Sequence, residues 1–119
     1  LRKKVLVLDL DETLVHTATK MPPRYDFHLK VQYDQEWGTY YVIKRPHVDQ
    51  FMQKFVVAWY PATNSSQVCQ WYHVVIFTAG IQEYANPVID LLDPEGGVEA
   101  RYFREVSIPL LLPNTCLTE

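Results

Sequence analysis

Residues Val5–Leu14 read VLVLDLDETL, and this stretch decides how the rest of the chain is interpreted. Its first half, Val5–Leu8, is a continuous apolar run, which is typical of a strand that is buried on both faces of a parallel sheet. The run ends at Asp9 and Asp11, and residues two apart in an extended chain point to the same side. Two neighbouring carboxylates repel each other unless a cation lies between them or one of them is protonated. The stretch therefore predicts a strand that ends in an acidic functional site.

The two acids also indicate a chemistry. A bound Mg²⁺ would remove the repulsion between Asp9 and Asp11 and would favour a substrate that carries phosphate oxygens. One carboxylate can attack phosphorus to give an aspartyl-phosphate, while its neighbour acts first as an acid and later as a base. The simpler alternative is that the acids only cap or solvate the end of the strand. A buried strand that ends in two acids without compensation is costly, so the functional interpretation is favoured.

The remaining patterns predict an α/β domain with a parallel sheet. Ligand sites in such sheets lie beyond the carboxyl ends of the strands, so Thr78, which follows the second apolar run, is expected to join Asp9 there. The predicted elements are a strand at Val5–Leu8, a hairpin of Phe27–Tyr33 and Thr39–Ile43, a helix that starts at Pro46 with an apolar stripe of Val48, Phe51, Met52 and Phe55, a strand at Val74–Phe77, a helix over Ile81–Leu92 whose start is reset by Pro87, and a strand at Arg101–Glu105.

Size and composition exclude several classes of protein. The 119 residues suit one domain. The net charge of −3, from 11 basic and 14 acidic residues, provides no broad electrostatic footprint for nucleic acid. Cys69 and Cys116 are too few for a disulfide scaffold and fit a reducing compartment. The apolar runs are far shorter than the ~20 residues of a membrane helix, so no membrane span is expected.

Several separated blocks resemble one family. Val7–His16, which reads VLDLDETLVH, resembles the first motif of the haloacid dehalogenase superfamily. More narrowly, it is similar to that of the RNA polymerase II C-terminal-domain (CTD) phosphatases and their NLI-interacting-factor-like and Dullard-type relatives. The resemblance implies a Rossmann-like haloacid dehalogenase fold in which residues 20–43 form a β-hairpin flap inserted after the first strand. The other similar blocks are Lys44–Phe51, Phe77–Gly80, Tyr84–Val88 and Arg101–Glu105.

The resemblance also implies a function, that of a Mg²⁺-dependent protein serine/threonine phosphatase with a phosphoprotein substrate and an aspartyl-phosphate intermediate. Asp9 would be the nucleophile and a metal ligand. Asp11 would be the general acid and base and would give the metal its backbone carbonyl. Thr78 would hold the phosphoryl group, and Arg104 would lie near the substrate phosphate. Tyr84 would help to line the groove for the substrate peptide, although core packing is the simpler alternative for it.

Two features depart from the family pattern. Residues 55–70 are expected to be an insertion loop. Residues 106–119 contain neither the lysine of the family's third motif nor the acidic pair of the fourth, since the last lysine is Lys54 and the last aspartate is Asp93. Their loss would weaken Mg²⁺ binding and the stabilisation of charge on the phosphoryl group.

The 119 residues are therefore expected to be a single, incomplete phosphatase domain, truncated so that the C-terminal strands and the motifs for full activity are missing. The alternative function is a non-catalytic binding or adaptor module, as in relatives that include a mitochondrial import subunit. The expected location is nuclear or cytoplasmic, with the nuclear envelope and the mitochondrion left open.

Overall fold

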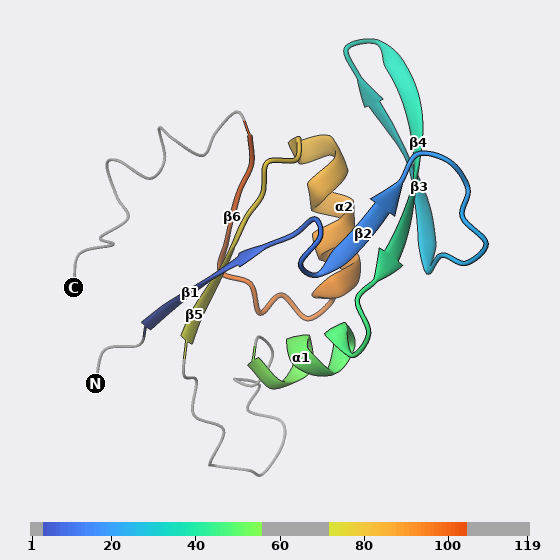
Figure 1. Ribbon diagram of the computed structural model, residues 1–119. Coiled ribbons are helices and arrows are strands. Elements are labelled where there is room, and N and C mark those ends of the chain that lie inside the picture. The colour runs from blue at the N-terminus through green and yellow to red at the C-terminus, as the bar shows by residue number, and fades with distance from the viewer. Residues whose placement is uncertain (1–3, 56–71, 105–119) are drawn as a thin grey trace.

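Six strands and two helices make up the part of the chain that is described, which the computed structural model gives for residues 4–55 and 72–104 (Figure 1). Three of the strands form a sheet in the order β1-β5-β6, with β5 in the middle. β1 spans Lys4–Asp9, β5 spans Tyr72–Phe77 and β6 spans Ala100–Tyr102. Both pairings are parallel, so the predicted α/β architecture with a parallel sheet is confirmed.

The register of this sheet aligns the ends of its strands. Asp9 lies opposite Phe77, and Phe77 lies opposite Tyr102. These residues are the last of β1, β5 and β6, so the three carboxyl ends lie level along one edge. The third predicted strand is therefore present, but it ends at Tyr102, and Arg104 belongs to the segment beyond the edge. Ligand sites of parallel α/β sheets form at such an edge.

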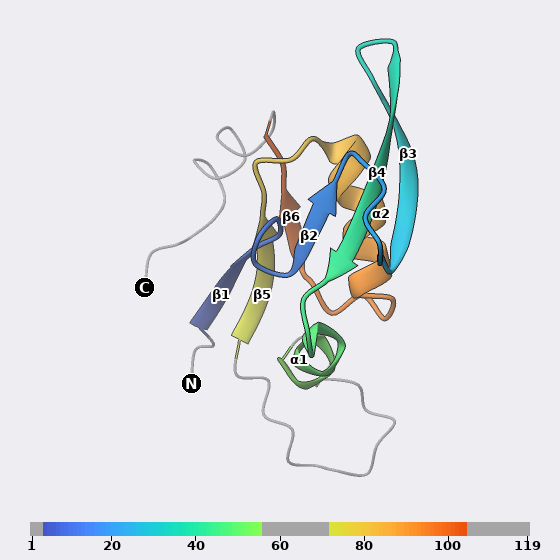
Figure 2. The ribbon, with the colours of Figure 1, turned by 45° about the vertical axis from the view of Figure 1, so that its right-hand side comes forward.

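The other three strands form an antiparallel sheet in the order β2-β4-β3. β3 spans Phe27–Tyr33 and β4 spans Glu36–Lys44, so the predicted hairpin is confirmed, and its tip projects from the body of the protein (Figures 1 and 2). Its turn consists of Asp34 and Gln35 alone, with φ values of 52° and 67°. Two left-handed residues match the twist of a hairpin, which lets β4 begin three residues earlier than the sequence pattern indicated.

Strand β2, Val15–Ala18, is a short element that the sequence pattern did not predict. It pairs with the end of β4, where Val15 lies opposite Lys44 and Ala18 opposite Tyr41. The chain therefore turns directly from the acidic loop after β1 into the antiparallel sheet.

Helix α1 spans Val48–Phe55 and starts two residues after Pro46. His47 has a φ of 66°, which is outside the right-handed helical region and delays the start of the helix. Two members of the predicted stripe, Val48 and Met52, are buried, as expected from their helical spacing.

Helix α2 spans Gln82–Leu92 and contains Pro87, so the prediction that Pro87 resets its start is wrong. The backbone N–H of Ala85 already donates to the carbonyl of Ile81 at 2.9 Å, so the helix is established before the proline is reached. Val88 and Ile89, on the side of the helix next to the core, are fully buried. The free energy gained by burying them offsets the cost of the backbone hydrogen bond that Pro87 cannot donate.

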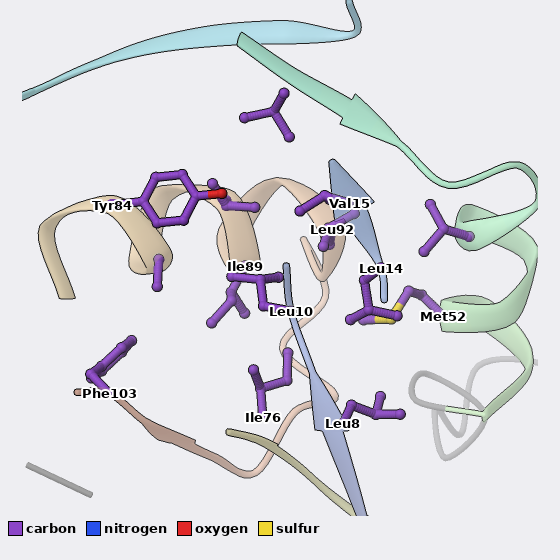
Figure 3. Packing of buried hydrophobic residues seen from close by; sticks show 14 of the residues in the cluster. Leu8, Leu10, Leu14, Val15, Met52, Ile76, Tyr84, Ile89, Leu92 and Phe103 are labelled. Atoms are coloured by element: carbon purple, nitrogen blue, oxygen red, sulfur yellow. The ribbon is translucent and has the colours of Figure 1, made fainter. Parts of the chain in front are cut away.

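The hydrophobic core lies where α2 and α1 pack against the two sheets (Figure 3). On β1, Leu8 is 9% exposed and belongs to the core, whereas Val5 is 44% exposed and Val7 is 49% exposed. Among the described residues only one face of β1 is covered, so the prediction of burial on both faces is wrong for this part of the chain. The reason is that both described helices pack into the core cluster that contains Leu8. They therefore cover the face of β1 to which Leu8 belongs, and not the face of Val5 and Val7.

Polar contacts of three buried or half-buried side chains fix the connection from α2 to β6. The carboxylate of Asp93 is 3% exposed and accepts the N–H groups of Gly97 and Val98, each at 2.8 Å. Arg101 on β6 contacts the side chains of Asn86 and Asp90 on α2 at 2.9 and 2.8 Å. These contacts fix the position of β6 relative to α2. They therefore also fix where the segment beyond Tyr102 begins.

No helix in the described ranges is long and apolar enough to cross a membrane. The predicted insertion over residues 55–70 and the divergent tail over residues 106–119 fall outside the described residues, apart from Phe55 at the end of α1. The division of the chain into a flap and an insertion stays a prediction.

We expect Asp93→Ala to lower the free energy of unfolding of the natural full-length protein by about 2 kcal/mol, because it leaves the N–H groups of Gly97, which is buried, and Val98, which is half-buried, without their acceptor. Denaturation in urea measures the change. Glu95→Ala is the matched control, since Glu95 is an exposed acid in the same loop. An equal effect of the two substitutions would show that the Asp93 contacts do not stabilise this connection.

Candidate active site

Three segments that follow parallel strands meet at the carboxyl edge of the sheet. Asp9 ends β1, Thr78 follows β5, and Arg104 comes shortly after β6. The N–H of Thr78 donates to the carbonyl of Tyr102 at 2.9 Å, and the N–H of Arg104 donates to the carbonyl of Gly80 at 3.2 Å. The sheet topology thus places Asp9 and Thr78 at the same edge of the sheet, on neighbouring strand ends, as the sequence predicted.

A cavity of about 400 Å³ lies at this edge and is lined by residues of the antiparallel sheet, of α2 and of the segments that follow β1, β5 and β6. It brings together three of the predicted site residues, Asp11, Tyr84 and Arg104. Asp9 and Thr78 do not line it themselves, although Asp9 is two residues from Asp11. Among the lining residues Arg104 is the only cation, so the cavity combines one acid with one base and otherwise uncharged groups.

The loop after β1 separates the acids from the core. Leu10 is fully buried, while Asp9 and Asp11, on either side of it, point away from the core as the alternation of an extended chain requires. Glu12 has a φ of 63°, and its N–H donates to the carbonyl of Val15 at 2.8 Å. This tight turn brings β2 back beside Asp11.

The Asp9 carboxylate is held by a neighbour within the same turn. Thr13 Oγ1 donates to Asp9 Oδ2 at 3.3 Å. This contact restrains the rotation of the carboxylate that the resemblance assigns as the nucleophile.

The Asp11 carboxyl has an unusual environment. It is half-buried, and its Oδ1 accepts the hydroxyl of Tyr84 at 2.6 Å. Burial raises the pKa of Asp11 above its ordinary value, and the nearby charges of Asp9 and Glu12 raise it further, while the hydrogen bond from Tyr84 acts in the opposite direction. A carboxyl that holds its proton more readily than usual is suited to act as a proton donor.

Tyr84 satisfies both interpretations of the sequence, core packing and a position in the site. Its ring is 7% exposed and belongs to the core cluster, while its hydroxyl reaches the cavity. Figure 3 shows the ring extending from α2 with the hydroxyl oxygen directed towards β2. There it lies 2.5 Å from Thr17 Oγ1. The ring also packs against Tyr40 of β4, with centroids 5.4 Å apart.

Backbone groups of Ala79 and Gly80 orient the side chains of Arg104 and Thr78. The Nε of Arg104 donates to the carbonyl of Ala79 at 2.6 Å, which leaves the far end of the guanidinium for other partners. The Thr78 hydroxyl is nearly buried and accepts the N–H of Gly80 at 3.0 Å.

Thr13, Thr17 and Tyr40 are parts of this arrangement that were not predicted from the sequence. Thr13 lies four residues after Asp9, and this short spacing is a local signal from which their contact could have been predicted. Thr17 required the short strand β2 to be recognised. The contact of Tyr40 with Tyr84 joins residues far apart in the sequence and has no local signal.

Asp9 and Asp11 are the acids of the site that could hold Mg²⁺. Among residues 4–55 and 72–104, no three His, Cys, Asp or Glu side chains gather as a metal site. Mg²⁺ commonly uses one or two carboxylates together with waters and the phosphate of a substrate. Asp9 and Asp11, close enough for the charge of one to raise the pKa of the other, fit this kind of site.

Comparison with known proteins identifies the family. A family model described as NLI interacting factor-like phosphatase matches residues 4–112. The chain belongs to this family, which is a phosphatase family of the haloacid dehalogenase type that includes the CTD phosphatases. The resemblance stated from the motifs is confirmed.

Particular relatives support this assignment. Phosphatase Herzog of Drosophila melanogaster is 43% identical over 105 residues, which cover 88% of this chain and 26% of that protein. The human CTD small phosphatase-like protein is 44% identical over 103 residues, which cover 87% of this chain and 33% of that protein. The chain thus spans about a quarter to a third of the length of these curated relatives.

A solved structure supports the fold. The fission yeast RNA polymerase II CTD phosphatase Fcp1, bound to beryllium fluoride, superposes with a TM-score of 0.64 at 21% identity. The match covers 86% of this chain and 30% of that one. The predicted haloacid dehalogenase type of α/β fold is confirmed.

We expect Asp11→Asn to stabilise the protein in metal-free buffer at about pH 7, because the fold disfavours the charged carboxylate there. The folded-state pKa is raised, so the penalty is present above the ordinary pKa of 3.8 and disappears as the pH falls below it. Unfolding midpoints at about pH 7 and about pH 3 measure the difference between variant and wild type. Asp34→Asn, at the exposed tip of the hairpin, is the control. A stabilisation that does not shrink at low pH would contradict the assignment.

Proposed function

We propose that the natural protein is a Mg²⁺-dependent phosphatase that hydrolyses phosphoserine or phosphothreonine in protein substrates through an aspartyl-phosphate. The observation that carries the proposal is the pairing of Asp11, a carboxyl with a raised pKa, with Arg104 in one cavity next to Asp9. Membership in a phosphatase family supports the reaction class. The names of the human relatives, which refer to the CTD, support a phosphoprotein substrate.

The metal would be held by the Asp9 carboxylate and the backbone carbonyl of Asp11. Bound there, Mg²⁺ supplies positive charge that offsets the repulsion between the acids and the phosphate oxygens. The protein contributes the remaining positive charge through Arg104, which lines the same cavity. Thr78 would donate a hydrogen bond to a phosphoryl oxygen from the end of β5.

In the first step, an Asp9 carboxylate oxygen forms a bond to phosphorus as the ester bond from phosphorus to the serine or threonine oxygen breaks. The departing oxygen keeps the electron pair of that bond and takes the proton of the Asp11 carboxyl, which releases a neutral alcohol. Thr13 restrains the attacking carboxylate through its contact with Oδ2, which leaves Oδ1 as the oxygen for the attack.

In the second step, water attacks the phosphorus of the aspartyl-phosphate, and the bond from Asp9 to phosphorus breaks. The Asp11 carboxylate, having lost its proton in the first step, takes one proton from the water. Inorganic phosphate leaves, and both carboxyl groups return to their starting states. One residue thus serves as acid and base in turn.

We expect Asp9→Asn to reduce phosphate release from a phosphoserine peptide by about 10³-fold or more, because an amide is a far weaker nucleophile than a carboxylate. The assay uses the natural full-length protein with Mg²⁺, and removal of the metal with EDTA is expected to abolish activity. Asp34→Asn makes the same chemical change at the exposed hairpin tip and should retain full activity.

Activity that survives Asp9→Asn would overturn the proposed mechanism. Binding of the phosphopeptide by a wild-type protein that releases no phosphate would favour the alternative, a phosphatase-like binding module. Isothermal titration with the same peptide separates these two results.

We expect Arg104→Ala to raise the KM for the phosphopeptide about ten- to hundredfold, because it removes a charged hydrogen-bonding group from the cavity. Arg104→Lys should recover only part of the loss, since lysine keeps the charge and lacks the planar fork. Arg24→Ala, an exposed arginine outside the cavity, is the matched control. An unchanged KM in Arg104→Ala would remove this residue from phosphate binding.

A further inference from the structure

Tyr84 connects three parts of the fold through its hydroxyl and its ring. It lies in the first turn of α2, where the ring is almost fully buried. The hydroxyl donates to Asp11 Oδ1 at 2.6 Å and lies 2.5 Å from the hydroxyl of Thr17 on β2. These contacts span 73 and 67 residues of sequence, so they exist only through the tertiary fold.

The direction of these hydrogen bonds follows from counting hydrogens. A phenol has one hydrogen, and Tyr84 gives it to Asp11. The short contact with Thr17 is therefore made by the threonine hydroxyl donating to the tyrosine oxygen. The result is a chain of donors that runs from Thr17 through Tyr84 to Asp11 and ends on one carboxyl oxygen.

We infer that Tyr84 is a positioning residue for the general acid, holding Asp11 by Oδ1 so that the proton it transfers is carried on Oδ2. An oxygen that accepts the tyrosine hydrogen cannot carry the acidic proton without losing that bond. The proton is consequently placed on the other oxygen, and the carboxyl is restrained from turning. This role rests on the proposed phosphatase function and deepens it.

The surroundings of Tyr84 keep this donor in place. Tyr40 of the hairpin packs against its ring. A Cβ added at Gly80 would lie only 3.2 Å from Tyr84 Cδ1, so the loop after β5 leaves the ring little space to move. Burial, together with the neighbouring Asp11, also raises the pKa of Tyr84, so its hydroxyl keeps the hydrogen that it donates.

The role predicts how the rate depends on the leaving group. Release of a serine oxygen requires a proton from Asp11, whereas p-nitrophenolate is stable enough to leave without one. Loss of the Tyr84 hydroxyl should therefore slow the first step, transfer of the phosphoryl group to Asp9, for a phosphoserine peptide and affect that step much less for p-nitrophenyl phosphate. The second step, in which Asp11 acts as a base, is the same for both substrates. A residue that only stabilises the fold or binds the peptide would not produce this difference in the rate of the first step.

The test compares, for the two substrates, the single-turnover rate at saturating enzyme with which the alcohol or p-nitrophenol is released by Tyr84→Phe of the natural full-length protein with Mg²⁺. We expect this rate for the phosphoserine peptide to fall at least about tenfold relative to the rate for p-nitrophenyl phosphate. The ratio is independent of the fraction of enzyme that is folded, because both rates come from one preparation. Thr17→Val, which removes the donor to Tyr84, should shift the ratio in the same direction by a smaller factor.

Tyr41→Phe is the matched control, because Tyr41 packs with Tyr25 and does not line the cavity. Its ratio should equal that of the wild type. Equal falls of both single-turnover rates in Tyr84→Phe, or a fall in the peptide rate that disappears at saturating enzyme, would overturn the positioning role. A wild type without Mg²⁺-dependent activity would overturn the proposed function and this role with it.

Discussion

The parallel register of β1, β5 and β6 is the constraint on which the rest of the site depends. Asp9, Phe77 and Tyr102 lie side by side at the ends of the three strands. Every residue that follows these strands consequently emerges at one edge of the sheet. A shift of one residue in the register would turn Leu8 out of the core and the acids into it, so burial of the apolar residues and placement of the acids are the same requirement.

The antiparallel sheet completes the site that the parallel sheet begins. β2 follows the acidic loop directly and supplies Thr17, and β4 supplies the ring of Tyr40. Helix α2, which packs against both sheets, places Tyr84 between these residues and Asp11. The acid is therefore held by a side chain of α2 that is itself held by the antiparallel sheet, and partial burial in this packing raises its pKa.

Much of the fold could be predicted from periodicity and turn chemistry. The apolar runs at Val5–Leu8 and Val74–Phe77 became the two paired strands β1 and β5, because runs rich in β-branched side chains favour an extended chain. Prediction failed where tertiary packing outweighs local preference. Pro87 lies inside α2 because its neighbours are buried, and the Asp34–Gln35 turn is shorter than its polar surroundings indicated because the β ladder extends to Glu36.

The sequence alone determined the acidic end of β1 and the family of the chain. An apolar strand that runs into Asp9 and Asp11 is a local pattern, and local patterns can be read from neighbouring residues. Only the tertiary structure decided which groups surround Asp11. Tyr84 and Thr17 become its hydrogen-bonded neighbours through contacts that bridge 73 and 67 residues of chain, and no short-range pattern in a sequence encodes contacts at such separations.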